Sequence, residues 1–560
     1  MDVNCGVFNN RPISERQNYF KNRLEMFTKK PEGAETLADV RRRMTQAILE
    51  INQKHRYENI LIVSHGDSLW MLETALGGLG NEASLAWSDK NFLHVGEVRS
   101  LKFNNWPFNE EGELDLHRPY IDEVYLACLK CDKKVTRIKE VADVWFDSGG
   151  MPFASEEYPQ RYPADYICEA IDQTRGWFYT LLAIGVLMQK GTPYKNVISL
   201  GLILDKNGQK MSKSKGNAVD PWAMADKYGI DLVRWYFYTV NPPGEPKKFD
   251  EAELVKIRNK FHNLIFNSYV FLETYSGDRK RGAGAKASNI LDKWIFSRLH
   301  ETILNVTRGL ENYEVGDAAK AIGDLVDDLS RWYIRRSRRR VEALPILGSV
   351  LTDVAKLLAP FCPFFAEALH QSLSEKSSVH LQSYPKADKK LIDYELDEDM
   401  VKIRRWASLA LAQRSERGIK VRQPLTCLKV KKQTLQIKDN HELLSLLADE
   451  ANVKDVFFDD SIAGEVELDC NITPELKKEG LRRELTRTIQ DLRHEAGCRP
   501  GQLVSIFLVL PGDLRSGLQL DQDFYKQVAA KDVKFARGAN LDLEKKEKLD
   551  NQEIWLGLKK

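Results

Sequence analysis

The sequence has few cysteines, no long apolar run and almost no net charge. Eight cysteines are scattered over 560 residues, which does not make a disulfide framework, so we expect reduced thiols. No apolar stretch is long enough to cross a bilayer, and no signal-peptide pattern opens the chain; we therefore expect a cytoplasmic protein with no membrane partner. The formal net charge of +2 argues against a generally basic surface, so any nucleic-acid binding requires local patches.

The composition is that of an ordinary soluble protein with several cores. Hydrophobic residues make up 43% and charged residues 29% of the chain, and the length allows several domains. Four segments can be separated: 1–100, 101–290, 291–400 and 401–560. The second holds the motifs described next, the third has long amphipathic helices, and the fourth is mixed. We expect its charged closing stretch, 543–560, to be mobile at its end.

The most informative string is Lys-Met-Ser-Lys-Ser-Lys-Gly-Asn at residues 210–217. It follows an apolar, strand-like run at 197–204 and a turn at 205–208. A mobile loop of this kind can bring ammonium groups onto a triphosphate and stabilise the charge that develops when pyrophosphate leaves. Lys210 and Lys213 are the candidate catalytic residues. The alternative is a solvated basic turn.

A second polar group follows an apolar run around Tyr166 that we interpret as a buried strand, with a helix after it at 174–188. Glu169, Asp172 and Gln173 then fall at the strand's carboxyl end, where doubly wound sheets bind ligands. A carboxylate there can accept a hydrogen bond from a ribose hydroxyl or pair with the ammonium group of an amino acid. The alternative for Asp172 is helix capping.

These two motifs, together with Asp-Val-Trp-Phe-Asp-Ser-Gly at 143–149, resemble the isoleucyl-tRNA synthetases of class I. The resemblance covers residues 114 to about 373, and weaker strings at 418–425 and 479–493 resemble the family's carboxyl-terminal junction. It implies an α/β protein: a partial Rossmann-type core, an α-helical anticodon-binding bundle, and a mixed α/β carboxyl-terminal region. Implied ligands are isoleucine and ATP with Mg²⁺. One departure is Ala170, where the family usually has glycine. The implied adenylate-binding residues are Glu169, Asp172, Gln173, Met211, Ser212 and Ser214.

Six arginines lie within ten residues, at 331–340. Apolar residues precede and enter this run at helical spacing, so one helix face is core while the arginines line another. The planar guanidinium can bond two phosphate oxygens; a solvated helix face is the alternative. In the resembled family this helix belongs to the anticodon-binding bundle, which implies isoleucine tRNA as a partner. The apolar residues are Ile322, Leu325, Val326, Leu329, Trp332 and Tyr333. The candidate tRNA-binding residues are Arg331, Arg335, Arg336, Arg338, Arg339 and Arg340.

The first hundred residues contain a different pattern. Residues 59–67 read as a buried-type strand that ends near His65 and a glycine turn. With 31–37 and 40–44, they resemble the carboxyl-terminal half of a histidine phosphatase of the phosphoglycerate mutase type, in which His65 would help to bind a phosphoryl group. A structural histidine is the alternative. The family's Arg-His-Gly string is missing, and without that nucleophile covalent phosphoryl transfer has no first step. We expect this segment to be inactive alone.

Three features of the resembled synthetases are missing or incomplete. A His-x-Gly-His string and an editing domain are not found, and Cys128 and Cys131 supply only half of a tetrahedral Zn²⁺ site; two unligated thiols are the alternative. We expect that the chain begins inside a larger protein, whose amino-terminal half could be a separate fragment. Two functions remain open: an isoleucine–tRNA ligase whose isolated chain is inactive, and a tRNA-binding remnant that activates no amino acid. A histidine phosphatase is the least favoured.

Overall fold

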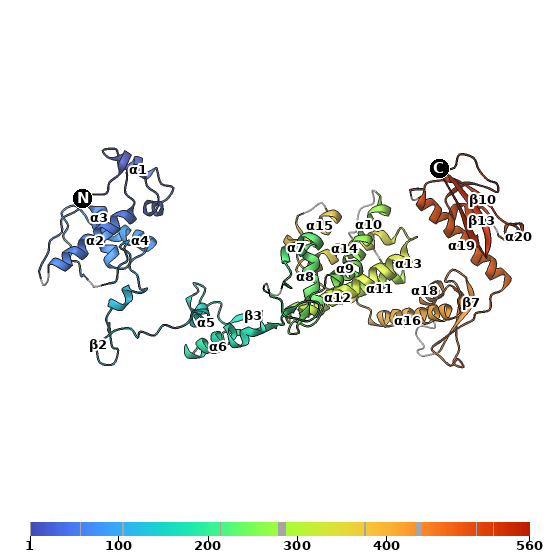
Figure 1. The fold of residues 1–560 in the computed structure, drawn as a ribbon, viewed down its shortest axis with the longest axis horizontal. Coiled ribbons are helices and arrows are strands. Elements are labelled where there is room, and N and C mark those ends of the chain that lie inside the picture. The colour runs from blue at the N-terminus through green and yellow to red at the C-terminus, as the bar shows by residue number, and fades with distance from the viewer. Residues whose placement is uncertain are drawn as a thin grey trace. The chain divides into compact units, whose positions relative to one another are not determined.

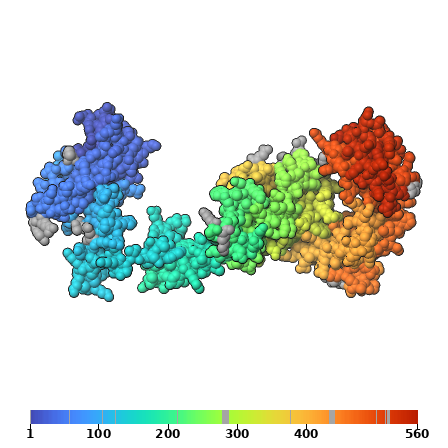
Figure 2. Space-filling model, viewed as in Figure 1, coloured from blue at the N-terminus to red at the C-terminus, as the bar shows by residue number. Residues whose placement is uncertain are grey.

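The structure is a computed structural model, and it divides the chain into two compact units, Met1–Met151 and Pro152–Lys560. The first unit runs from blue to cyan in Figure 2. No helix in the described ranges is both long and apolar enough to span a membrane. The structure describes residues 2–55, 58–103, 106–212, 214, 216–277, 287–374, 377–431, 440–499, 501–518 and 520–560.

The first unit is built around three helices, α2 (Leu37–Lys54), α3 (Gly66–Leu76) and α4 (Asn81–Asn91). A capping box between Thr36 and Asp39 begins α2, and the apolar faces of α2 and α3 form the core. Its short elements are η1 (Gly6–Phe8), α1 (Ile13–Gln17), η2 (Arg23–Phe27), η3 (Tyr120–Glu123), β1 (Leu126–Ala127) and β2 (Lys134–Val135). Helix α5 (Val144–Ala154) follows them.

The predicted strand at 59–67 is wrong. Residues 58–65 form no strand, and Leu61 and Val63 are 75% and 85% exposed. A strand needs a hydrogen-bonded neighbour, and among the described residues of this unit only β1 and β2 pair, with each other. An apolar run therefore did not suffice to place this segment in a sheet.

The second unit opens with a parallel pair of strands, β3 (Ala164–Ala170) and β4 (Tyr194–Leu200). The 3-10 turn η4 (Ile171–Arg175) and helix α6 (Trp177–Leu187) connect them, which confirms the predicted strand around Tyr166 and the helix after it. The expectation that this strand is buried is wrong, because Tyr166 is 48% exposed and the sheet has only two strands in the described ranges. A second parallel pair follows, and two helices lie between its strands in the sequence. These elements are β5 (Ile203–Leu204), α7 (Pro221–Tyr228), α8 (Ile230–Thr239) and β6 (Lys247–Lys248).

A helical bundle occupies the middle of the second unit (Figure 1). The predicted apolar stripe is confirmed, because Ile322, Leu325 and Tyr333 are at most 1% exposed and Trp332 packs against the same core. The bundle consists of α9 (Glu251–Ile257), η6 (Arg258–His262), α10 (Asn263–Ser276), α11 (Ile290–Glu311), α12 (Val315–Asp327), η7 (Asp328–Ile334), α13 (Arg335–Ser337), α14 (Ala343–Leu358), α15 (Pro363–Leu373), η8 (Val379–Leu381), η9 (Lys389–Leu391) and α16 (Tyr394–Glu416).

Two α/β modules complete the chain. The first is the sheet β8-β7-β9 with helix α18, and it shares the core of the bundle. The second has its own core between helix α19 and the sheet β11-β10-β13-β12. Their elements are β7 (Leu425–Val430), α18 (His441–Ala451), β8 (Val453–Phe458), β9 (Val466–Leu468), α19 (Pro474–Glu495), β10 (Val504–Val509), α20 (Gly512–Gly517), α21 (Gln522–Gln527), β11 (Ala530–Lys534), β12 (Leu543–Leu549) and β13 (Gln552–Lys559).

The expectation that the chain is mobile at its end is wrong. Strand β13 is an inner strand that pairs with both β10 and β12. Its residues Ile554, Leu556 and Leu558 are at most 1% exposed. The charges of the closing stretch lie mainly on β12, while the apolar residues of β13 are buried in the core, and burial of apolar surface is what orders this end.

Candidate active site and tRNA-binding surface

The signature loop at 210–217 is closed at its base by one amide side chain. Asn217 donates through Nδ2 to Asp205 Oδ2 at 2.9 Å and to the Lys210 carbonyl at 3.3 Å. Its Oδ1 accepts from the Ser212 backbone N–H at 2.9 Å, while Leu204 and Lys210 form an antiparallel bridge. The entry and exit of the loop are thus held together, although no role was predicted for Asn217.

The predicted turn at 205–208 is confirmed and forms part of the same closure. Gly208 donates to the Asp205 carbonyl at 2.9 Å, and Asp205 Oδ1 accepts from the backbone N–H groups of Asn207 and Gln209. The Asn217 amide, followed by these N–H groups, lowers the pKa of the Asp205 carboxyl, because each donor favours the ionised form. The carboxylate therefore works as the fixed acceptor of the loop.

The candidate residues of the loop differ in their surroundings. Lys210 is exposed, whereas Met211 packs against the apolar cluster that α7 and α8 build. The hydroxyls of Ser212 and Ser214 lie 3.2 Å apart. Lys213, the second predicted catalytic residue, lies outside the described residues. An ammonium and two hydroxyls are thus presented on a loop that Met211 anchors.

The second group lies where β3 ends. Glu169 pairs in register with Ser199 of β4, and Glu169 and Asp172 are exposed. Gln173 accepts from the Trp177 backbone N–H at 2.9 Å and donates to Asp172 Oδ2 at 3.1 Å. Gln173 thus satisfies the first backbone N–H of α6, whose N-cap residue is Gly176, and among the described contacts Asp172 caps no helix. Both carboxylates remain open to a ligand at the carboxyl edge of the sheet.

The backbone at Ala170 and the packing around Gly201 shape this edge of the sheet. Ala170 has a φ of −67°, which any residue adopts, so the alanine that replaces the family's usual glycine strains no backbone. Gly201, by contrast, has no room for a side chain, because a Cβ atom there would lie 2.2 Å from the Glu245 carbonyl oxygen. Buried Lys247 fixes the same segment by donating to the Asn241 side chain at 2.6 Å. Neither Gly201 nor Lys247 was predicted to matter.

The arginine run at 331–340 divides into two kinds of side chain. Arg340 is 2.5 Å from Asp292 Oδ2, whose side chain is 1% exposed, and Arg335 and Arg336 both pair with Glu450. The side chains of Arg336 and Arg340 are 17% and 23% exposed, and their ion pairs join separate segments of the protein.

The remaining arginines of the run face solvent. Arg338 and Arg339 are exposed, and neither forms an ion pair within the described ranges. Arg331 pairs with Asp327 at 2.8 Å on the surface, and such an exposed pair contributes little and exchanges readily. The solvent-facing set suits phosphate contact, and this role stays a prediction.

His65 and the cysteine pair belong to the first unit. His65 precedes α3 and places its Nδ1 atom 3.6 Å from Asp2 Oδ2; its role as a phosphate contact stays a prediction. Cys128 and Cys131 lie on the β1–β2 hairpin, where the Lys130 backbone N–H and then the Cys131 thiol lower the pKa of the Cys128 thiol. No group of three or more His, Cys, Asp or Glu residues within the described ranges could hold a metal ion. The two thiols alone do not make a tetrahedral zinc site.

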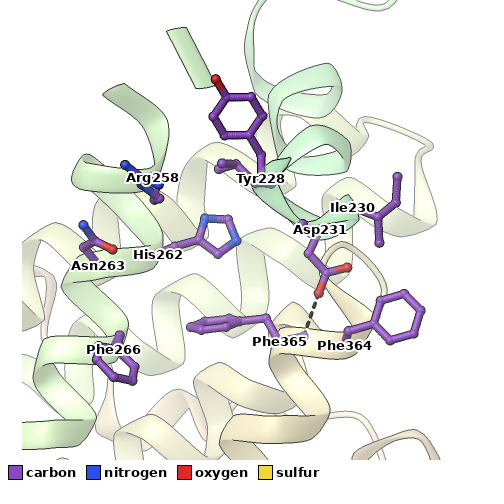
Figure 3. A pocket seen from close by; sticks show the side chains of 11 residues that line it. Tyr228, Ile230, Asp231, Arg258, His262, Asn263, Phe266, Phe364 and Phe365 are labelled. Atoms are coloured by element: carbon purple, nitrogen blue, oxygen red, sulfur yellow. Dashed lines mark hydrogen bonds between the residues drawn. The ribbon is translucent and has the colours of Figure 1, made fainter. Parts of the chain in front are cut away.

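A cavity of about 580 Å³ lies elsewhere, between the start of α8, η6 and α15, and contains none of the predicted residues (Figure 3). Phe266, Phe364 and Phe365 line it, together with His262. Neither ring nitrogen of His262 has a hydrogen-bond partner among the described residues, and burial lowers the pKa of this histidine to about 4. The imidazole is therefore neutral near pH 7.

Comparison with known proteins identifies the segments. Residues 85–249 match the tRNA synthetases of class I (I, L, M and V), and residues 292–431 match the anticodon-binding domain of tRNA ligase. These two segments are thus similar to class I tRNA synthetases. Residues 1–101 match the histidine phosphatase superfamily, branch 1. The predicted family and fold class are confirmed.

Individual proteins to which this chain is similar are isoleucine–tRNA ligases. It is 39% identical over 450 residues to isoleucine–tRNA ligase of Dehalococcoides mccartyi (strain CBDB1), covering 72% of this chain and 44% of the relative. It is 41% identical over 382 residues to isoleucine–tRNA ligase 2 of Bacillus cereus (strain ATCC 14579), which covers 64% of this chain and 36% of that relative. The chain thus spans less than half the length of these relatives. Agrobacterium radiobacter K84 LeuRS, solved with tRNA and LeuAMS, is 22% identical, with a TM-score of 0.40 over 48% of this chain and 36% of that one.

Proposed function

We propose that the chain is part of an isoleucine–tRNA ligase, which forms isoleucyl-adenylate from isoleucine and ATP and transfers isoleucine to its tRNA. In this proposal the chain activates isoleucine only when the amino-terminal half of the active site is also present. The observation that carries the proposal is the loop at 210–217, which Asn217 and Asp205 close at 2.9 Å in a chain whose relatives are isoleucine–tRNA ligases.

The loop would act on the phosphates of ATP. Lys210 and Lys213 place positive charge where pyrophosphate leaves, and such preorganised charge accelerates the step because it interacts most strongly with the transition state. Ser212 and Ser214 would donate to phosphate oxygens. Mg²⁺, which accompanies ATP, would neutralise part of the triphosphate charge.

The carboxylates beside the sheet would hold the other end of the adenylate. Glu169 and Asp172 are exposed at the carboxyl edge of β3. One would accept from the ribose hydroxyls and the other would pair with the ammonium group of isoleucine. Gln173 fixes the position of Asp172 through a 3.1 Å hydrogen bond, so its own contribution to adenylate binding is to orient the carboxylate.

The exposed apolar surface of this part of the chain supports the need for an amino-terminal half. Parallel sheets are normally covered on both faces, yet β3 and β4 form a sheet of two strands in the described ranges. Leu187 on α6 is 74% exposed, and Tyr166 and Val197 on the strands are 48% and 43% exposed. An amino-terminal half that adds strands and helices would bury these side chains. It would also have to supply two more ligands before Cys128 and Cys131 could bind Zn²⁺.

The alternative is a tRNA-binding remnant, and isoleucine-dependent exchange of pyrophosphate into ATP separates the two. The purified chain alone should show no exchange. Adding the amino-terminal half of the Dehalococcoides mccartyi ligase, expressed separately, should restore it. Lys213→Ala should then reduce the rate by about 10²-fold or more. Lys206→Ala, which removes an exposed lysine from the preceding turn, is the matched control and should leave the rate unchanged. Pyrophosphate exchange by the chain alone would refute the need for an amino-terminal half. If the mixture with the added half shows no exchange either, the tRNA-binding remnant is favoured.

A further inference from the structure

Arg414, on α16, is fully buried and makes no ion pair with a carboxylate among the described residues. Within the described ranges, the hydrogen bonds of its guanidinium all go to backbone carbonyl oxygens. Its Nε donates to Ala451 at 2.9 Å, and its terminal nitrogens donate to Lys420 at 3.3 Å, to Gln423 at 2.7 Å and to Asn452 at 2.7 Å. The first and last acceptors end α18, and the other two belong to the loop 418–424. One guanidinium thus fixes a loop against a helix end.

Other contacts fix the same loop. The Asn452 side chain donates to the Val421 carbonyl at 2.8 Å, and Gln423 Nε2 donates to the Leu476 carbonyl at 2.7 Å. The Gln423 backbone N–H closes a turn onto the Lys420 carbonyl at 3.0 Å. The carbonyl oxygens of three loop residues, Lys420, Val421 and Gln423, are therefore occupied from within the protein.

The loop also carries hydrogen-bond donors that no described contact uses. Lys420, Val421 and Arg422 are exposed, and among the described contacts their backbone N–H groups donate to no acceptor. The Arg422 guanidinium forms no ion pair in the described ranges. Lys420 pairs with Glu484 at 2.6 Å, but the buried charge of Arg414 has no carboxylate to balance it. A rigid surface that offers N–H groups and excess positive charge suits a phosphate.

This loop lies next to the arginine run of the bundle. Glu450, which pairs with Arg335 and Arg336, is two positions before Asn452 at the end of α18. Asn452 in turn accepts from Arg414 through its carbonyl and donates to the loop through its side chain. The end of α18 therefore contacts both the arginine run and the loop 418–424.

We propose that the loop 418–424 is a second, preformed contact for the ribose–phosphate backbone of the bound tRNA. Arg422 and the loop N–H groups bind phosphate, and Arg414 is a positioning residue that touches no RNA. This inference rests on the proposed tRNA binding. It adds a surface beyond the arginine run, and it gives a function to a buried cation that pairs with carbonyl groups alone.

The test is a filter-binding titration of the full-length chain with isoleucine tRNA at several salt concentrations. Arg422→Ala should weaken binding about fivefold at 0.15 M salt and reduce the salt slope by about one, the effect of one lost phosphate contact. Arg405→Ala, which removes an α16 arginine paired with Glu465 instead of the loop, is the control and should leave affinity and slope unchanged.

A double-mutant cycle tests Arg414. Arg414→Lys should weaken binding by a similar factor in the wild-type background and have almost no effect in the Arg422→Ala background, because both changes disable one contact. Independent, additive losses would mean that Arg414 only supports the fold. This inference alone would be overturned if Arg422→Ala left affinity and salt slope unchanged while the triple variant Arg335→Ala, Arg338→Ala and Arg339→Ala bound tRNA more weakly. No tRNA binding by the wild-type chain would overturn the proposed tRNA binding as well.

Discussion

Arg340→Ala should destabilise the helical bundle, although Arg340 belongs to a run that resembles a phosphate-binding surface. Its guanidinium is 2.5 Å from Asp292 Oδ2, and the Tyr333 hydroxyl donates to Oδ1 of the same carboxylate at 2.9 Å. Removing one partner of a buried ion pair costs about 3–5 kcal/mol. Arg340 keeps 23% of its side chain exposed, so water can replace part of the lost interaction, and we expect about 3 kcal/mol.

Hydrogen exchange followed by mass spectrometry measures this locally in the full-length chain. A loss of about 3 kcal/mol should accelerate exchange of the most protected amides in α11 and α14 by about 10²-fold. Arg339→Ala, one position away and exposed, should change the same rates by less than about twofold. Adding Asp292→Asn to Arg340→Ala should restore part of the protection, because it removes the unpaired buried charge. Unchanged exchange in Arg340→Ala would refute the assignment of this arginine to the fold.

Three further changes have definite expected outcomes. Burial lowers the pKa of His262 to about 4, so this histidine binds a proton more readily in the unfolded chain. Its contribution to the free energy of unfolding should be fully present above the unfolded pKa near 6.5, and the free energy of unfolding should fall by up to about 3 kcal/mol as the pH drops towards 4. Urea unfolding across that range should show less pH dependence in His262→Leu, and an identical dependence would contradict this. Asn217→Ala should lower pyrophosphate exchange by the reconstituted enzyme about 10-fold or more by releasing Asp205 and Ser212, and an unaltered rate would mean that this amide does not position the loop. Leu187→Glu should leave the isolated chain folded but block co-elution with the amino-terminal half on gel filtration, whereas Lys190→Glu should not; co-elution of both variants would place the contact elsewhere.

The correct sequence-based predictions rest on local patterns. The apolar stripe from Ile322 to Tyr333 follows from helical periodicity, and the turn at 205–208 follows from the hydrogen-bonding chemistry of Asp, Asn and Gly. Both are decided by residues close together in the chain.

What the sequence could not predict depends on distant partners. Asn217 reaches Asp205 across 12 residues, and the pairing of Arg336 with Glu450 joins two separate helices, so no local pattern marks either. The predicted strand at 59–67 failed for the same reason, because a strand requires a neighbour that local sequence does not specify. At 552–559 the neighbours exist, and a charged-looking chain end became an inner strand.

Aminoacylation of tRNA tests the central proposal most directly. The chain, mixed with the separately expressed amino-terminal half, should transfer labelled isoleucine to isoleucine tRNA in the presence of ATP, and should discriminate against labelled valine and leucine. Neither polypeptide alone should produce isoleucyl-tRNA. If the two polypeptides co-elute and the mixture binds tRNA, yet no isoleucine becomes attached, the chain is not part of an isoleucine–tRNA ligase.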